Sequence, residues 1–500
     1  MASVKFLLNG PTETGWKLEP DFVHVIDLER TPYPVKVTID NGMLVCETGT
    51  PESLRVQVPW ALPGYNPSVF GTSTLPGNHQ PYILLIELAR GRLTDLRHFF
   101  QEGPAGTSRP LPAKFQQASD LFIAALMARN DVDKAADLAA KSLQTSIELG
   151  RETIHQQCSG HDIDEKLIQK LSVDLSSLRA NDLSASQRWA LANVRNCRIA
   201  PTWSELMTVE NQIHWHSWET PVRIARDANL RVHAGPLIDF SNDFLPPWVY
   251  RYTEISQLCR VFSNYVHYVV SNLKDQVDVW HVIRRPAMRQ VNVISEEQQI
   301  KIAVSAIQAV SRAFPAAEIV VDLTAPWAEW LTTASFELGP LHLADTLARA
   351  DLGLTGIGME LAMGYEFPGS HLREMIDVAR LLDMYQLVNL PLHLTVAVPG
   401  KQAEMQTTSL NQVGADSRQW PLGCSEKSQA EIGMALLRLA ASRAHVRSVH
   451  WATLSDTNGS EFLNSGLFDI GQSPVRLANE IEKINDVLRE YDTTIIEKKK

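Results

Sequence analysis

The feature that most constrains the fold is an alternation of short apolar runs with longer amphipathic segments, from about residue 167 to the end of the chain. Each apolar run has the length of a buried strand, and each following segment has apolar residues at helical spacing. We predict eight strands, at residues 171–175, 197–200, 232–238, 279–283, 318–323, 356–361, 392–398 and 448–454. We predict helices at residues 185–194, 218–228, 254–273, 296–314, 341–349, 371–385, 427–444 and 474–491, with Ser295 and Ser370 as N-caps.

Eight strand–helix units in sequence are the number found in a (β/α)8 TIM barrel, an α/β fold. Strand–helix–strand units build parallel sheets, and the clearest unit covers residues 232–286. Its two apolar runs end in polar residues, Asp239 in the first and Arg284 and Arg285 in the second. A doubly wound open sheet is the alternative, but no Gly-x-Gly-x-x-Gly pattern follows any predicted strand. We therefore favour the barrel.

The first 100 residues have a different pattern, with short β-like runs separated by proline and glycine. Runs at 23–26, 35–39, 43–46, 54–58 and 82–88, with a hairpin signal at Asn41-Gly42, predict a small β-sandwich. Its aromatic residues are candidates for stacking on sugar rings, although core packing is the more frequent role: Trp16, Trp60, Tyr65 and Tyr82. Residues 101–113 have the composition of a linker, and 114–156 read as helix. The predicted units are thus 1–100, 101–166 and 167–492, followed by a charged tail at 493–500.

Composition limits the classes of partner. The net charge is −11, which argues against nucleic acid or an anionic membrane. The five cysteines are scattered without a Cys-x-x-Cys pair, so we expect reduced thiols, a cytoplasmic protein and no metal site or cofactor. The N-terminal apolar stretch is too short for a secretion signal, and no run reaches membrane-spanning length. The oligomeric state stays open.

Several short motifs occur in a fixed order along the predicted barrel. They are Leu-Pro-Pro-Trp-Val at 245–249, a strand beginning near Trp280, Gly-Ile-Gly-Met-Glu at 356–360, Leu-Pro-Leu-His-Leu-Thr at 390–395 and His-Trp-Ala-Thr-Leu-Ser-Asp at 450–456. In this order and spacing they resemble the motifs of glycoside hydrolase family 10, the endo-xylanase family. The resemblance covers the whole predicted barrel. It implies a TIM barrel, a carbohydrate-related function and an oligosaccharide or polysaccharide as a possible partner.

The resemblance also implies positions for the two catalytic carboxylates of that family. The nucleophile position holds Val396 and the acid/base position holds Arg285. A retaining glycosidase needs two carboxyl groups, and valine cannot attack the sugar, while arginine stays protonated and cannot act as the acid. We therefore expect no conventional xylanase activity.

Other polar residues follow the predicted strands and would lie at the C-terminal face of a barrel. They are Glu205, Asp239, His281, Arg284, Arg285, Asp322, Glu329, Glu360, Thr395 and Asp456. Asp239 and Glu360 are the candidates for any catalytic role, because each interrupts an otherwise apolar strand end. The predicted binding site consists of Asp239, Arg285, Asp322, Trp327, Glu329, Glu360 and Trp451, with Trp330 as a further stacking candidate.

Three functions remain open at this point. The chain is a hydrolase that has moved its carboxylates, a non-catalytic barrel that binds a glycan or a protein, or an intracellular enzyme with another substrate, since a fold does not fix a function. An ion pair between Arg285 and Asp239 or Glu360 has a purely structural interpretation if side chains seal it from solvent.

Overall fold

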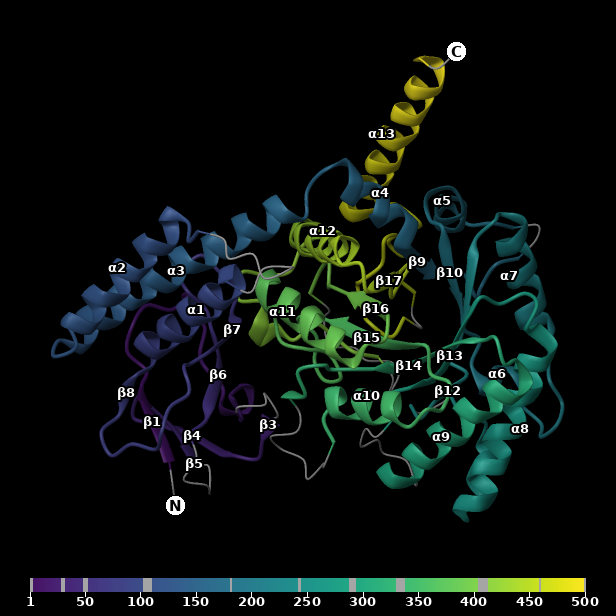
Figure 1. The fold of residues 1–500 in the computed structure, drawn as a ribbon, viewed down its shortest axis with the longest axis horizontal. Helices are drawn as coiled ribbons and strands as arrows, with labels where there is room; N and C mark the ends of the chain where they lie inside the picture. Colours follow the sequence, from purple (N-terminus) through teal and green to yellow (C-terminus); the bar gives the residue numbers. More distant parts are fainter. Residues whose placement is uncertain are drawn as a thin grey trace.

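The computed structural model describes residues 3–27, 32–47, 53–101, 110–179, 182–241, 244–286, 294–329, 338–402, 412–457 and 460–498. Most of the predicted linker, at residues 102–109, and Trp330 lie outside these ranges. Two parts are visible in Figure 1: small sheets with long helices toward the N-terminus, and a barrel from β9 onward.

The barrel is a closed parallel sheet, as predicted. Its strands are β9 (Leu171–Asp174), β10 (Asn196–Ile199), β11 (Arg231–Ala234), β12 (Ile238–Asp239), β13 (Val279–Arg284), β14 (Glu318–Leu323), β15 (Gly356–Ala362), β16 (Leu392–Ala397) and β17 (Val446–Trp451). Each pairs in parallel with its neighbour, and β17 pairs with β9 to close the ring. β11 and β12 both pair with β13, so they occupy one of eight positions, interrupted at Gly235 and Pro236.

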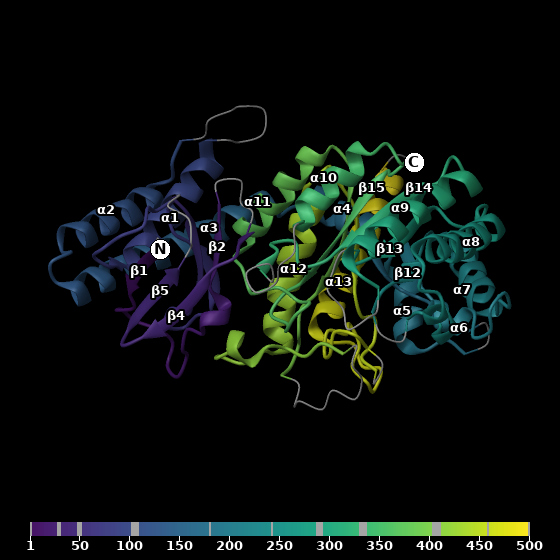
Figure 2. The ribbon, with the colours of Figure 1, turned by 90° about the horizontal axis from the view of Figure 1, so that it is seen from below.

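Helices surround the barrel, as Figures 1 and 2 show. The chain has α4 (His161–Lys170), α5 (Ala185–Asn193), α6 (Trp203–Leu206), α7 (His216–Asp227), α8 (Ile255–Leu273), α9 (Glu296–Ala313), α10 (Pro340–Arg349), α11 (Met375–Tyr385), α12 (Glu426–Ser442) and α13 (Arg476–Lys498). Ser295 caps α9 in a capping box with Gln298, as its position predicted. The predicted start of a helix at residue 371 was wrong, because α11 begins at Met375 after Glu374.

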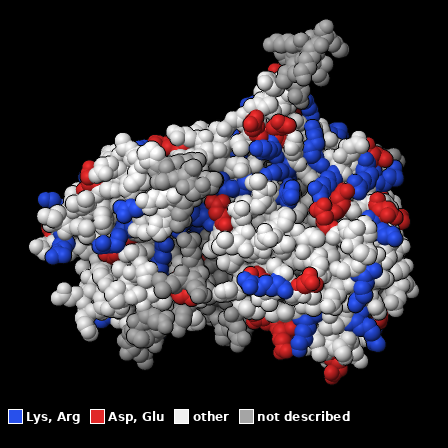
Figure 3. All heavy atoms as spheres, viewed as in Figure 1, with Lys and Arg blue, Asp and Glu red and all other residues white. Residues whose placement is uncertain are grey.

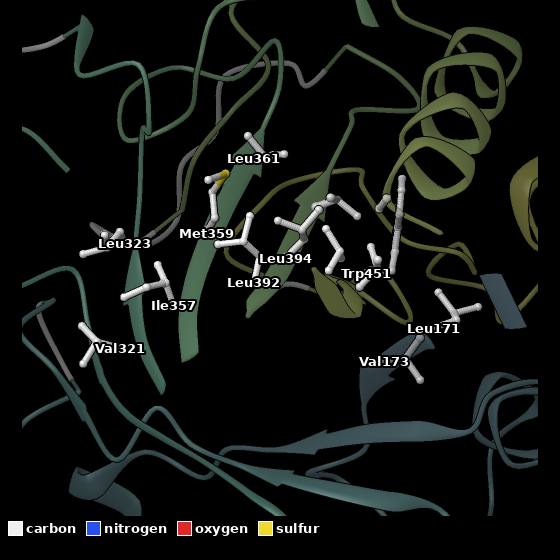
Figure 4. Close-up of a cluster of buried hydrophobic side chains, with 14 of the residues drawn as sticks. Leu171, Val173, Val321, Leu323, Ile357, Met359, Leu361, Leu392, Leu394 and Trp451 are labelled. Atoms are coloured by element: carbon white, nitrogen blue, oxygen red, sulfur yellow. The ribbon is translucent and has the colours of Figure 1, made fainter. Parts of the chain in front are cut away.

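The barrel strands alternate between an apolar face toward the helices and a polar face toward the barrel interior. Figure 4 shows part of the outer layer, with Ile357, Met359 and Leu361 on β15 beside Leu392 and Leu394 on β16. The intervening residues include Glu360, His393 and Thr395. Because side chains alternate along a strand, these residues point into the barrel. The interior of this barrel is therefore largely polar, and its apolar core lies between the strands and the helices.

The N-terminal part has two four-stranded sheets, with orders β4-β5-β1-β8 and β3-β2-β6-β7. The strands are β1 (Ser3–Leu7), β2 (His24–Ile26), β3 (Pro32–Tyr33), β4 (Lys36–Asp40), β5 (Met43–Glu47), β6 (Arg55–Trp60), β7 (Ser68–Gly71) and β8 (Tyr82–Ile83). The hairpin at Asn41 and Gly42 is present, and both residues have positive φ as a two-residue turn requires.

The predicted strand at residues 82–88 was wrong beyond Ile83, because α1 (Leu84–Gln101) begins there. Leu84, Leu85 and Leu88 are buried at helical spacing. The predicted helix at 114–156 is divided into α2 (Ala113–Met127) and α3 (Val132–Gln157). Residues of α1 and α3 share one core with both sheets, so the helices belong to this part of the fold.

All four aromatic residues proposed for sugar stacking belong to this core or pack against it. Trp16 and Trp60 are buried, with ring centroids 5.9 Å apart in an edge-to-face arrangement. Tyr82 is half-buried against the same core. Tyr65 is also half-buried, with the Arg151 guanidinium 5.1 Å from its ring centroid. Trp16 and Trp60 therefore pack the domain rather than offering exposed rings.

Ion pairs and a backbone hydrogen bond join the N-terminal part to the barrel. Arg92 of α1 pairs with Asp377 of α11 at 2.9 Å, and Asp95 of α1 accepts from Arg380 of α11 at 2.8 Å. The Val69 amide donates to the Leu372 carbonyl at 3.1 Å. The surface facing the viewer in Figure 3 has acidic and basic side chains interspersed. No helix in the described ranges is long and apolar enough to span a membrane.

Candidate functional site

Arg284 is the centre of a charged cluster at the C-terminal ends of the barrel strands. It is the last residue of β13, in register with Asp239 on β12 and with Asp322 on β14. Its guanidinium donates to Asp239 at 3.4 Å, to Glu461 at 2.7 Å and, through Nε, to Glu360 at 3.1 Å. The side chain of Arg284 is only 16% exposed.

Arg285 extends this cluster from the position where the resemblance places an acid/base. Its Nη2 donates to Glu360 at 2.9 Å and to Glu461 at 2.5 Å. The residue has φ of 54°, a left-handed conformation that is unusual for a side chain with a Cβ. Strain of this kind persists where surrounding contacts hold it, and here two carboxylates do so. Among the described residues, the ion-pair partner of Asp239 is Arg284 and not Arg285.

The cluster holds Glu360 in the ionised form. Burial alone would raise the pKa of Glu360, but the charges of Arg284 and Arg285 and a hydrogen bond from Thr324, at 2.6 Å, lower that pKa to about 2. The carboxylates raise the pKa of both arginines in turn, against the effect of burial. Asp239, Glu360 and Arg285 are 1%, 4% and 6% exposed, so side chains cover most of this cluster.

Two of the other predicted site residues belong to separate clusters. Both carboxylate oxygens of Asp322 lie 2.9 Å from Nδ1 of His281 inside the barrel. Glu329 pairs with Arg373 at 2.6 Å and accepts from the His371 amide at 3.2 Å. Burial would raise the pKa of Glu329, but the charges of His371 and Arg373 lower it to about 2.

The tryptophans lie in different places. Trp451 is fully buried between β17 and the helices, and its indole N–H donates to the Ser465 carbonyl at 2.8 Å. Trp327 is half-buried, with the Arg373 guanidinium 4.5 Å from its ring centroid. Of the two, only Trp327 has an exposed part that a ligand can reach.

Val396 faces away from the barrel interior. It belongs to the apolar layer with Leu392 and Leu394, and it pairs in register with Leu361 of the same layer. The neighbouring inward residue is Thr395, whose hydroxyl accepts from Arg198 at 3.2 Å. A one-residue shift of register exchanges the two faces of a strand. Neither residue carries a carboxyl group, so β16 supplies no nucleophilic glutamate at either position.

A cleft lies between the sheet β3-β2-β6-β7 and the α10–α11 side of the barrel. Its empty volume, open solvent included, is about 920 Å³. The lining includes His24, Arg55, Gln57, Asp95, Trp327, His342, Arg373, Asp377 and Arg380. Charged side chains here are paired, both within the N-terminal part, where Arg55 Nη1 donates to Asp95 at 3.0 Å, and across the cleft, where Arg380 pairs with Asp95 at 2.8 Å. The cleft therefore combines one aromatic ring with planar hydrogen-bonding groups held in fixed positions.

Sequence reasoning missed several members of these clusters. Glu461 lies in a loop after β17 and has no strand pattern to mark it. Arg198 and His233 are inward residues of β10 and β11. The sequence signal for their direction was the alternation of polar and apolar residues along those short strands. Glu205, another predicted residue, forms a capping box with Thr202 at the start of α6. Asp456 accepts from the Gly466 amide at 2.8 Å.

The fold and the charged cluster define a (β/α)8 barrel protein with a largely buried ionic network at the C-terminal ends of its strands. Neither a protein-family model nor a curated protein sequence matches this chain. Among solved structures, native xylanase 10B from Thermotoga maritima is similar, with a TM-score of 0.50, 15% identity and coverage of 66% of this chain and 99% of that chain.

Xylanase 10B from Thermotoga petrophila RKU-1, in a complex with xylobiose, has a TM-score of 0.49 and 16% identity over 66% of this chain and 96% of that one. A GH10 endoxylanase retrieved from a sugarcane soil metagenome has a TM-score of 0.48 and 12% identity over 64% and 99% of the two chains. The barrel thus resembles those of GH10 endo-xylanases. At such identities the likeness concerns the fold alone.

Proposed function

We propose that this protein is a xylanase-like barrel that binds a carbohydrate without hydrolysing it. The observation that carries the proposal is the ionic network at the strand ends. Arg285, at the position of the acid/base, is paired with Glu360 and Glu461, and β16 offers Thr395 and Val396 where a nucleophile is needed.

Relocated carboxylates are the alternative way to keep hydrolysis. A general acid must hold a proton near the working pH, and the low pKa of Glu360 and Glu329 leaves both groups ionised at neutral pH. Asp239 and Glu360 also share Arg284 as a partner, so neither has a free face toward a sugar. These pairs support binding over catalysis.

The cleft that contains Trp327 is the binding site in this proposal. Ligand sites in proteins are concave, with few fixed polar groups beside an apolar or aromatic surface. Guanidinium and carboxylate groups form paired hydrogen bonds with neighbouring hydroxyls, and a tryptophan ring packs on the apolar face of a sugar. The paired arginines and acids of the cleft would need little rearrangement on binding, which favours affinity.

Isothermal titration of the full chain with xylo-oligosaccharides and cello-oligosaccharides tests this function. We expect saturable binding to at least one series, with no reducing sugar released. Trp327→Ala should lower the affinity at least tenfold. Trp215→Ala is the matched control, because Trp215 is half-buried against Tyr268 on the α7–α8 side of the barrel and lies outside the cleft lining. Absence of binding to both series, or equal losses in the two variants, would contradict the proposed site.

A further inference from the structure

Three histidines from three different strands meet inside the barrel. His233 of β11, His281 of β13 and His393 of β16 are 2%, 0% and 3% exposed. One ring nitrogen from each lies within 4.8 Å of one from each of the others. Nδ1 of His233 and Nε2 of His281 lie 3.2 Å apart. The proposed carbohydrate function does not use this cluster.

Neighbouring polar groups fix the orientation of two of these rings. Asp322 lies 2.9 Å from Nδ1 of His281, and the Ser448 hydroxyl lies 2.9 Å from Nδ1 of His393. In both rings this leaves Nε2 directed elsewhere. A carboxylate or hydroxyl on one ring nitrogen is the usual support for a histidine whose other nitrogen binds a metal.

The third ring carries an unsatisfied group. Nε2 of His233 is buried and has no hydrogen-bond partner in the described chain. Buried polar nitrogens are nearly always hydrogen-bonded, so an orphan of this kind requires an explanation. A neutral His233 that binds an ion through Nδ1 carries its proton on Nε2, which stays without an acceptor, so this orphan specifies the tautomer and is not itself evidence for the ion.

Glycines on β15 provide the space for the cluster. A Cβ added at Gly356 would lie 3.0 Å from Cδ2 and 3.1 Å from Nε2 of His393. A Cβ added at Gly358 would collide with a carboxylate oxygen of Asp322. Any larger residue at either position would displace a histidine or its support. Both glycines therefore keep room for the same arrangement.

We propose that His233, His281 and His393 bind a divalent transition-metal ion, with Zn²⁺ as the best fit, inside the barrel. Two nitrogen ligands at about 2.0–2.1 Å from tetrahedral Zn²⁺ are roughly 3.3–3.4 Å apart, close to the separation of the His233 and His281 nitrogens. Imidazole nitrogens are ligands that suit zinc, and three of them leave the fourth position for water. The expectation of no metal site was based on the lack of a Cys-x-x-Cys pair, a signal that does not detect a site made of histidines.

Arg198 sets the charge balance of this site. Its Nη2 lies 3.3 Å and 3.4 Å from the two ring nitrogens of His281. Asp322 supplies one negative charge against this cation, so a divalent ion enters surroundings with no excess negative charge. Coulomb repulsion from Arg198 therefore opposes binding, and Arg198→Met should tighten it. If the three histidines only form hydrogen bonds and bind no metal, Arg198→Met should not tighten the binding of Zn²⁺.

The test is Zn²⁺ and Co²⁺ binding to the full chain after removal of metal with a chelator. We expect one Zn²⁺ per chain, a raised melting temperature, and the visible absorption of Co²⁺ in a nitrogen-rich tetrahedral site. His233→Gln, His281→Gln and His393→Gln should each abolish the Co²⁺ spectrum. Asp322→Asn should lower the affinity about 10–100-fold, as changes to such supporting groups do.

His450→Gln is the matched control. His450 is also a buried inward histidine, on β17, and its Nδ1 lies 3.3 Å from the Ser172 hydroxyl, outside the cluster of three. It should bind Zn²⁺ and Co²⁺ like the unmodified chain. Failure of the unmodified chain to bind one Zn²⁺, or equal binding by the glutamine variants of the cluster, would overturn the proposal. The Zn²⁺ stoichiometry is measured on the unmodified chain, so this part of the test does not depend on whether a variant folds.

Discussion

Arg285 donates a hydrogen bond to Glu360 at 2.9 Å, across the ends of two strands that are separated in the barrel by β14. Both residues lie at the C-terminal ends of barrel strands, the face at which TIM-barrel enzymes have their active sites. The arginine is permanently protonated and the carboxylate is ionised at neutral pH, so neither can serve as a proton donor there. At these strand ends the arginine and the carboxylate therefore neutralise each other's charge.

The first prediction concerns the stability that this network provides. Arg284→Met should lower the free energy of unfolding by about 3–5 kcal/mol, because removing one partner of a buried network leaves carboxylates without compensation. Asp239 would lose its ion-pair partner Arg284, and Glu360 would keep Arg285 and the Thr324 hydroxyl. Urea denaturation of the full chain measures the change.

Arg349→Met is the control for that measurement. Arg349 pairs with Asp345 on α10 at 2.7 Å, and its side chain is 79% exposed. The substitution should cause no measurable loss, because solvent screens an exposed pair. Equal effects of the two substitutions would show that the strand-end network is not a stabilising unit.

The second prediction is a loss of stability in acid. The pKa of Glu360 and Glu329 in the folded chain is about 2, below the ordinary 4.5, so the unfolded chain binds more protons between these values. The contribution of both groups is complete above about pH 4.5 and is lost as the pH falls toward 2.

Urea denaturation at several pH values between neutral and about pH 2 measures this dependence. Glu360→Gln should show a shallower decline than the unmodified chain, because one of the two groups no longer titrates. Glu431→Gln, at an exposed glutamate of α12, should show the unmodified decline. A decline that Glu360→Gln leaves unchanged would argue against a depressed pKa at this residue.

The third prediction tests the direction in which Val396 points. Val396→Glu should lower the free energy of unfolding by more than about 3 kcal/mol, because it buries a carboxyl group without a partner among apolar side chains. Val487→Glu, at a 61% exposed valine of α13, should change it by less than about 0.5 kcal/mol. A stable Val396→Glu chain that hydrolyses xylosides would show that residue 396 faces the barrel interior.

Most of the barrel could be predicted from the sequence because its signal is local. Runs such as 318–323 are apolar, bounded by polar residues and followed by helical periodicity, and β14 has those bounds. The N-terminal part was less predictable. Tyr82 begins a strand, but only two residues pair with β1 before the helical spacing of Leu84, Leu85 and Leu88 prevails.

The site was predictable in its residue types but not in its pairings. Asp239, Arg285 and Glu360 follow strands, so their meeting at one face of the barrel could be expected. The dominant role of Arg284 could not, because it depends on which residues of β13 face inward past the irregularity between His281 and Ile283. Glu461 could not be predicted either, since a loop brings it from beyond β17.

The measurement that tests the central claim most directly is turnover of a chromogenic aryl β-xyloside by the purified full chain. We predict no release of the aryl group above the rate in buffer, because Asp239 and Glu360 at the described strand ends are both paired with arginine. Turnover near roughly 10 s⁻¹, an ordinary enzyme value, that disappears in Glu360→Gln would contradict it.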